Sequence, residues 1–142
     1  MSLIFPERSF SCGEHALIEP IYVLKRIPLF SSFPDEELRN LLTLLRRKNL
    51  KKGEILFRQG DEGMALYLIL QGKIKISLSI RMDAVTLAIL GQGEFLGEMA
   101  LLDGMPRSAD AIALEDSYLY ALNRKDFLAF IVNNERVVRG VL

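Results

Sequence analysis

The sequence predicts a mainly β fold with flanking α-helices, built as an antiparallel β jelly-roll barrel. The first observation is a series of short apolar segments between residues 50 and 122, separated by turns that mostly contain glycine. The second is that the segments before and after this region carry apolar residues at helical spacing. Many short strands at close spacing, enclosed between helical segments, are typical of antiparallel barrels and jelly rolls.

The composition indicates one globular unit. The chain has 142 residues, of which 50% are hydrophobic, so it has enough apolar material for a single core. Its 18 basic and 18 acidic residues give a formal net charge of zero, and the chain as a whole lacks the charge signature of a nucleic-acid or membrane binder. We expect an N-terminal tail at 1–19 and one domain at 20–142.

The sequence also predicts a cytoplasmic protein without a membrane span. The longest apolar run, 64–70, is much shorter than the roughly 20 residues that a transmembrane helix needs. The single cysteine, Cys12, cannot form an internal disulfide, which favours a reducing compartment. Cys12 and the single histidine, His15, could together ligate a metal or haem, but their segment lacks periodicity, which favours ordinary tail residues.

Two helices are predicted before the strands. A short helix is expected at 20–26, and a longer one has Pro34 in its first turn. The acidic residues 35–37 complement the positive end of the dipole of the longer helix, and the cationic residues 46–48 complement its C-terminal end. A nucleic-acid patch is the alternative for that cationic cluster. The apolar stripe of this helix consists of Leu38, Leu41, Leu42 and Leu45.

Six strands are predicted from apolar runs and the turns between them. Alternation within one of these strands, at 73–80, predicts that four apolar side chains share an inward face: Ile74, Ile76, Leu78 and Ile80. The predicted strands are 54–58, 64–70, 73–80, 84–90, 107–114 and 117–122.

Two helices are predicted after the strands. Asn123 is a suitable N-cap for the first of them. A second begins near Asn134 or Glu135 and keeps an apolar face up to Leu142, which we interpret as the start of a truncated helix.

The segment 95–113 combines groups suited to a ribose phosphate. Arg107 offers several N–H donors to a phosphate, whereas Glu98 only accepts hydrogen bonds and would repel the same phosphate. A ligand with both hydroxyls and a phosphate satisfies the pair. Gly97 permits close approach of the backbone, and the turn from Glu98 to Leu102 can point amide groups at an anion. Leu101 and Leu102 are expected to pack into the barrel.

Alternatives exist for the single residues of this segment. A surface salt bridge would also explain Arg107, and a solvated hydroxyl would explain Ser108. A strand that starts at Arg107 would send these two side chains to opposite faces, unless its start is irregular.

The sequence Gly97-Glu98-Met99-Ala100-Leu101-Leu102, followed by Pro106-Arg107-Ser108-Ala109, resembles the phosphate-binding cassette of the cyclic nucleotide-binding domain. This domain occurs in the catabolite activator and fumarate-nitrate regulator (CRP/FNR) family of bacterial regulators. The glycine-containing segments 53–60, 67–72 and 91–98 resemble the barrel of the same family. The resemblance implies its double-stranded β-helix fold.

The resemblance also implies roles for individual residues. Glu98 would accept the ribose 2′-hydroxyl, Arg107 would pair with the cyclic phosphate, and Ser108 would donate a hydrogen bond to it. Backbone amides would complete the cradle, at Gly97, Glu98, Met99, Ala100 and Ala109. Side chains of the pocket wall would contact sugar and base, namely Phe57, Ile76 and Leu87.

The implied function is a cyclic nucleotide sensor that prefers cAMP over cGMP. The resemblance implies a bacterial transcription regulator whose DNA-binding domain is absent from this chain, with a homodimer formed through the C-terminal helix. Attachment to a kinase, channel or transporter is the alternative output. No enzymatic activity, cofactor, metal, membrane or direct nucleic-acid contact is expected. Two alternatives remain: a degenerate barrel used for dimerisation or another ligand, and a cupin-type metalloenzyme, which usually needs several histidines where this chain has His15 alone.

Overall fold

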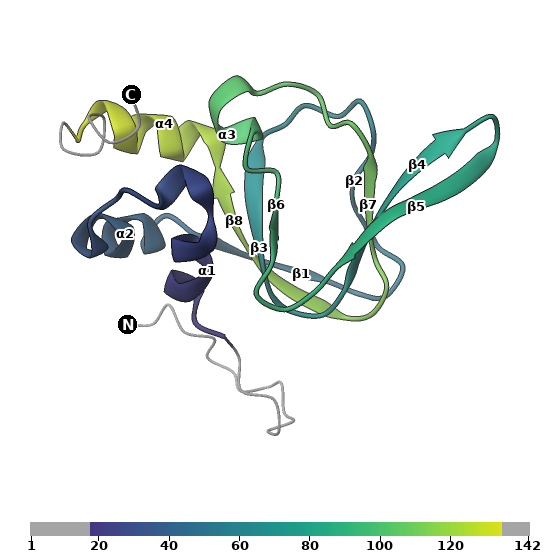
Figure 1. Ribbon diagram of the computed structural model, residues 1–142, viewed down its shortest axis with the longest axis horizontal. Helices are drawn as coiled ribbons and strands as arrows, with labels where there is room; N and C mark the ends of the chain where they lie inside the picture. The colour runs from purple at the N-terminus through teal and green to yellow at the C-terminus, as the bar shows by residue number, and fades with distance from the viewer. Residues whose placement is uncertain (1–17, 135–142) are drawn as a thin grey trace.

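The computed structural model describes residues 18–134, which form a β-barrel with a helical layer packed on one side (Figure 1). The helices α1, α2 and α4 lie together, and a long hairpin of β4 and β5 projects from the opposite side. The helical elements are α1 (Pro20–Arg26), the 3-10 turn η2 (Pro28–Phe30), α2 (Asp35–Leu42), α3 (Ala100–Asp103) and α4 (Arg124–Val132).

The strands of the described residues form two four-stranded antiparallel sheets, which confirms the predicted fold class. One sheet has the order β1-β8-β3-β6 and the other β2-β7-β4-β5. The six predicted strands are all present, and all but β7 have bounds within one residue of the prediction. The strands are β1 (Arg46–Leu50), β2 (Ile55–Phe57), β3 (Ala65–Gln71), β4 (Ile74–Ile80), β5 (Asp83–Leu90), β6 (Phe95–Leu96), β7 (Asp110–Ala113) and β8 (Ser117–Asn123).

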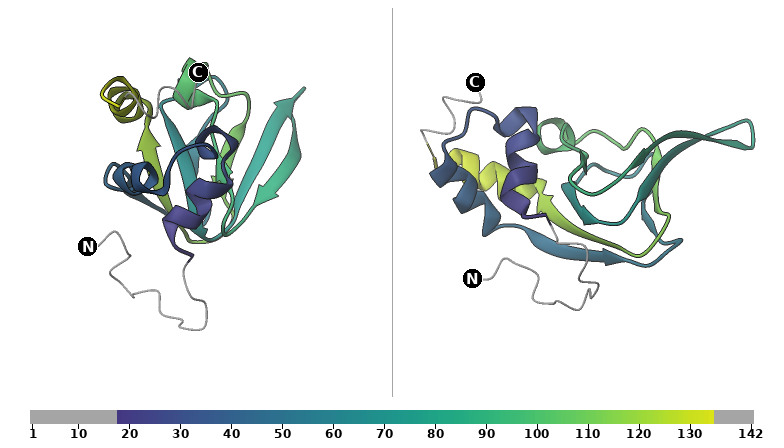
Figure 2. Two further views of the ribbon diagram at one scale, coloured as in Figure 1. Left: turned by 60° about the vertical axis from the view of Figure 1, so that its left-hand side comes forward. Right: turned by 60° about the horizontal axis from the view of Figure 1, so that its bottom comes forward.

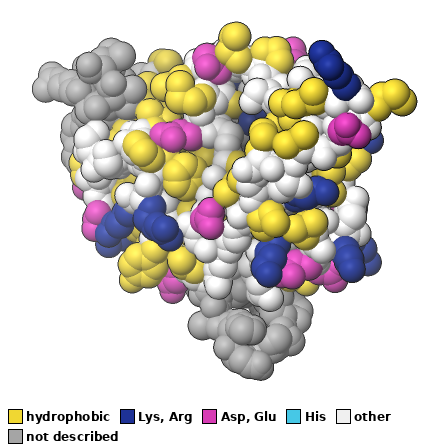
Figure 3. Space-filling model, turned by 45° about the vertical axis from the view of Figure 1, so that its right-hand side comes forward, with side chains coloured by type: hydrophobic (Ala, Val, Ile, Leu, Met, Phe, Trp, Pro, Cys, Tyr) yellow, Lys and Arg dark blue, Asp and Glu magenta, His cyan; other side chains and the backbone are white. Residues whose placement is uncertain are grey.

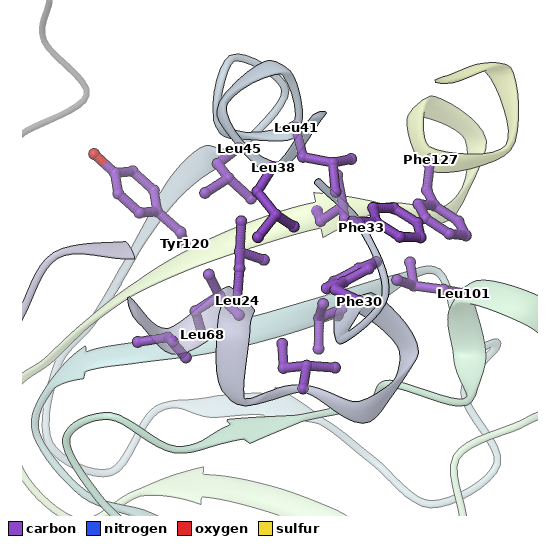
Figure 4. Close-up of a cluster of buried hydrophobic side chains, with 14 of the residues drawn as sticks. Leu24, Phe30, Phe33, Leu38, Leu41, Leu45, Leu68, Leu101, Tyr120 and Phe127 are labelled. Carbon is purple, nitrogen blue, oxygen red and sulfur yellow. The ribbon is translucent and has the colours of Figure 1, made fainter. Parts of the chain in front are cut away.

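Two hydrophobic clusters hold these layers together. Between the helices and the first sheet, the fully buried rings of Phe30 and Phe127 have centroids 5.7 Å apart (Figure 4). Leu68 of β3 belongs to this cluster, while its neighbour Ile69 belongs to a second cluster between the sheets. Because successive side chains of a strand point to opposite faces, β3 contributes to both cores. The second cluster consists of Leu50, Ile69, Ile74, Leu96, Ala111, Ala113 and Leu119.

The prediction that residues 46–48 end a helix is wrong. The helix α2 ends at Leu42, and these cations lie in β1, which pairs antiparallel with β8. The backbone of β8 needs hydrogen-bond partners on both edges, and β1 supplies one edge while β3 supplies the other. Tertiary pairing therefore overrides the local helix preference of this segment.

The prediction of one continuous inward face on β4 is also wrong. A register shift between Ile76 and Ser77 interrupts the alternation, so that Ser77 is buried and Ile80 is exposed. β4 pairs with β7 only as far as Ser77, and beyond this residue its only partner is β5. The outer half of β4 consequently has no second sheet to cover, and its hairpin extends away from the barrel (Figure 2).

Large hydrophobic side chains on this hairpin are exposed, and the view that brings this side forward shows hydrophobic and charged groups interspersed (Figure 3). At its tip, Arg81 and Met82 both have positive φ, at 51° and 75°. This backbone geometry is typical of two-residue hairpin turns. The exposed hydrophobic residues of the hairpin are Ile80, Met82, Val85, Leu87 and Ile89.

Asn123 occupies the predicted N-cap position of α4, although its side chain makes no capping hydrogen bond. No helix among residues 18–134 has the length and apolar character of a transmembrane span. Cys12, His15 and the C-terminal helix predicted from residue 135 lie outside the described residues.

Two glycine turns generate a prediction for stability. Gly72 and Gly53 both have positive φ, at 114° and 89°, but a Cβ at Gly72 would collide with the buried Ser117, whereas a Cβ at Gly53 would meet nothing within 4 Å. We expect Gly53→Ala to destabilise by about 1 kcal/mol and Gly72→Ala by at least about 2 kcal/mol, because only the latter adds a steric clash. Urea denaturation measures both, and equal losses would contradict the clash.

Candidate functional site

The predicted site residues line a pocket of about 470 Å³ between β6, α3 and the segment that leads into β7. A smaller pocket of about 200 Å³ adjoins it and shares Leu96, Gly97, Arg107 and Ser108. The larger pocket is lined by Phe95, Leu96, Gly97, Glu98, Met99, Ala100, Asp103, Met105, Pro106, Arg107 and Ser108.

Arg107 lies at the centre of this site and is only 9% exposed. Its Nη2 donates a hydrogen bond of 2.7 Å to the carbonyl of Ala65. Its backbone N–H donates to the Asp61 carbonyl at 2.7 Å, and its own carbonyl accepts from Gly60 at 2.8 Å. These bonds hold Arg107 in an irregular segment that precedes β7. The strand begins at Asp110 and not at the predicted residue 107.

The guanidinium of Arg107 keeps unused hydrogen-bonding capacity. Its Nε is buried and has no hydrogen-bond partner, and no carboxylate oxygen among the described residues lies within ion-pair distance of it. A buried donor without a partner is costly unless a ligand satisfies it. The surface salt bridge considered for this residue is therefore not formed within residues 18–134.

Two aromatic rings surround the same guanidinium. Its Cζ lies 4.3 Å from the ring centroid of Phe57 and 5.8 Å from that of Tyr67. Burial lowers the pKa of Arg107, while its interactions with Tyr67 and Asp61 oppose this shift. Burial also raises the pKa of Tyr67, and the interaction with Arg107 opposes that shift. A raised pKa favours the neutral phenol of Tyr67, and arginine side chains stay protonated in proteins.

Gly97 makes room for this arginine. Its φ is +88°, and a Cβ built at this position would lie 2.6 Å from Arg107 Nη1 and 2.8 Å from the Ala65 carbonyl oxygen. A side chain at residue 97 would therefore displace the guanidinium. The sequence predicts a close approach between the Gly97 backbone and a ligand, and the approach that the structure shows is one to the arginine.

Glu98 lines the pocket, but its carboxylate also reaches the helical layer. Its Oε2 accepts a hydrogen bond of 2.8 Å from the backbone N–H of Leu29 in η2. An ionised carboxylate accepts several hydrogen bonds, so this contact leaves capacity for a ligand hydroxyl.

The turn α3 differs from the prediction in one side chain. Leu101 is fully buried in the cluster beneath the helices, whereas Leu102 is 44% exposed, so only one of these leucines packs inward as predicted. Successive residues of a single helical turn point about 100° apart, which brings only one of the two onto the core. The N–H of Ala100, one of the amides predicted for the cradle, donates to the Gly97 carbonyl at 3.1 Å in the turn that leads into α3.

The structure brings most other predicted site residues together. Phe57, Ile76 and Ala109 line the smaller pocket with Ser108, which is exposed and also lines the larger one. Leu87 lies on β5, is 55% exposed, and lines neither of these two pockets.

Sequence reasoning did not assign Tyr67 to the site, because within an apolar run it is indistinguishable from an ordinary core residue. In the part of the chain that the structure describes, no group of three His, Cys, Asp or Glu side chains could hold a metal ion.

The family model of the cyclic nucleotide-binding domain matches residues 47–134, which include all the residues that line the two pockets. The chain belongs to the cyclic nucleotide-binding domain family. This assignment confirms the resemblance stated from the segment 97–109.

Known members of the family include bacterial regulators and protein kinases. The cyclic AMP receptor protein of Thermus thermophilus is 44% identical over 109 residues, which cover 76% of this chain and 50% of that protein. The N-terminal domain of a transcriptional regulator from Streptomyces coelicolor A3(2) has a TM-score of 0.78 at 32% identity, over 84% of this chain and 86% of that one. Human cGMP-dependent protein kinase 2 is 29% identical, over 73% of this chain and 14% of the kinase. The chain thus spans half of the Thermus protein and a small part of the kinase.

The Glu98 contact generates a prediction that needs no ligand. Glu98→Ala should destabilise the domain by about 1 kcal/mol, because the Leu29 amide loses its acceptor. Glu98→Gln should cost less, since its amide oxygen can still accept. Chemical denaturation measures the loss, and NMR hydrogen exchange at the Leu29 amide should accelerate in the alanine variant alone. Equal exchange in both variants would contradict the hydrogen bond.

Proposed function

We propose that this domain binds a cyclic nucleotide, with cAMP preferred over cGMP, and acts as the sensor domain of a bacterial transcription regulator. The observation that carries the proposal is the Arg107 guanidinium, which lines a pocket of about 470 Å³, has a buried Nε without a partner and forms no ion pair with a carboxylate of the described residues. A monoanionic phosphate supplies both the missing acceptor and the missing counter-charge.

The rest of the pocket suits a ribose attached to that phosphate. Glu98 supplies an acceptor for the 2′-hydroxyl, and Ser108 supplies a hydroxyl on the same side as Arg107. The side chains of Phe57 and Ile76 form an apolar wall of the smaller pocket. The proposed ligand contacts therefore come from the residues that the sequence predicted, except Leu87, which is exposed on the hairpin and lines neither pocket.

The preference for cAMP rests on the family comparison. The Arg107-Ser108-Ala109 sequence resembles that of the cAMP-binding bacterial regulators, and the relative with 44% identity is named for cyclic AMP. A hydroxyl after the arginine also occurs in cGMP-binding relatives, and the cGMP-dependent kinase is 29% identical.

The same comparison supports the proposed role in transcription regulation. The two bacterial relatives described above are a cyclic AMP receptor protein and a transcriptional regulator, which favours a regulatory binding domain over an enzyme. A putative potassium channel protein of Rhodopseudomonas palustris is also 31% identical, so attachment to a channel is the alternative output. Dimerisation through the C-terminal helix, the boundaries 1–19 and 20–142, and the cytoplasmic location stay predictions from the sequence.

Calorimetric titration with cAMP tests the binding proposal. Charge-assisted hydrogen bonds contribute about 1.5–3 kcal/mol, so Arg107→Leu should weaken binding about ten- to a hundredfold. Arg39→Leu, which removes an exposed arginine from α2, is the matched control and should leave affinity unchanged. Parallel titrations with cGMP and linear AMP test the base preference and the need for a cyclic phosphate. Equal affinity in the Arg107→Leu variant would overturn the site.

Hydrogen exchange tests the sensor role. A ligand shifts a conformational equilibrium only by its differential affinity for the two states, so a sensor must differ between its free and bound forms outside the pocket. We expect saturating cAMP to change amide exchange in α4, since α4 follows the barrel directly. Unchanged exchange in α4, together with protection at the pocket, would reduce the domain to a passive binder.

A further inference from the structure

We propose that Phe57 and Tyr67 form an aromatic clamp that positions the Arg107 guanidinium for an anionic ligand without neutralising it. This inference rests on the proposed function for its ligand, but the clamp itself is a feature of the ligand-free domain. It assigns Phe57 and Tyr67 as positioning residues, which act on the ligand through Arg107.

The clamp is built from both sheets. Phe57 ends β2 and Tyr67 lies in β3, and these strands belong to different sheets. Their ring centroids are 6.2 Å apart with an interplanar angle of 32°, and both rings lie within cation–π distance of the Arg107 Cζ. Closure of the barrel therefore brings the two rings to the same cation.

Aromatic rings and a carboxylate differ in whether they leave the N–H donors of the guanidinium available to a ligand. A carboxylate would occupy the N–H donors of the guanidinium and offset its charge, so an incoming phosphate would have to displace it. A ring face attracts the cation through its quadrupole and carries no net charge. Asp61 is the acidic residue that influences Arg107 electrostatically, but its Oδ2 accepts a hydrogen bond of 2.9 Å from the Arg58 amide.

The remaining contacts fix the direction of the guanidinium. Nη2 is held by the Ala65 carbonyl at 2.7 Å, and Nη1 lies where a side chain on Gly97 would be. The Arg107 Nε has no hydrogen-bond partner, and Ser108 lines the smaller pocket together with Arg107. The rings thus restrain the cation, and the Ala65 carbonyl and the Tyr67 side chain engage part of its N–H donors, while Nε keeps no partner.

Phe57 also lines the smaller pocket, so direct contact with the ligand is the competing explanation for any effect of its mutation. The two explanations differ in their dependence on Arg107. A residue that acts through the arginine has no effect once the arginine is absent, whereas a residue that contacts the ligand keeps its effect.

A double-mutant cycle with cAMP separates these explanations. Phe57→Leu should weaken binding about three- to tenfold, from the loss of one cation–π contact, while Phe57→Tyr keeps the ring and most of the affinity. In the Arg107→Leu background, Phe57→Leu should cause no further loss. Tyr22→Leu on α1 removes an exposed aromatic ring that lines neither pocket; it is the matched control and should bind like the wild type. An equal loss from Phe57→Leu in both backgrounds, or no loss in either, would overturn the clamp.

If the wild-type protein binds no cyclic nucleotide, the proposed function is refuted but the clamp is not. A measurement on the ligand-free protein then tests the clamp. Ring currents should shift the NMR resonance of the buried Arg107 Nε–H. Phe57→Leu should move this resonance toward its ordinary position, whereas Phe57→Tyr should not. An identical resonance in wild type and Phe57→Leu would refute the clamp, whatever the titrations show.

Discussion

The burial of one arginine cation without an ion-paired carboxylate constrains the rest of the site. A buried charge is costly unless its surroundings compensate for it, and around Arg107 the compensation comes from the Ala65 carbonyl, the rings of Phe57 and Tyr67 and the more distant charge of Asp61. The backbone of Arg107 is hydrogen-bonded to Gly60 and Asp61, in the connection between β2 and β3. Gly97 is required because any larger residue would take the space of the guanidinium. The cation is accommodated only when both sheets have closed around it.

The same pocket is connected to the helical layer through Glu98. Its carboxylate is one of the groups that line the pocket, yet it accepts a hydrogen bond from η2, which lies 69 residues earlier in the chain. η2 in turn contributes Phe30 to the core shared by α1, α2 and α4. The site and the helices are therefore parts of one packing arrangement.

Local patterns predicted much of this arrangement. Alternating apolar residues and glycine turns located six strands, and the segment 97–109 identified Arg107, Glu98 and Gly97 because their chemistry is readable from residue type. Features that depend on pairing were missed: β1 forms because β8 needs a partner, and the irregularity in β4 arises where β7 ends. The contact of Tyr67 with Arg107 joins distant residues, and nothing in the run around Tyr67 distinguishes it from the core.

The hairpin of β4 and β5 has a consequence for how the domain unfolds locally. Beyond Ser77, each of its strands has a single hydrogen-bonded neighbour, and few of its side chains are buried. Segments of this kind open at a small fraction of the free energy of global unfolding. Arg107 is held by β2, β3 and the loops beside them, so the hairpin can fray from its tip inward while the charged centre of the pocket stays assembled.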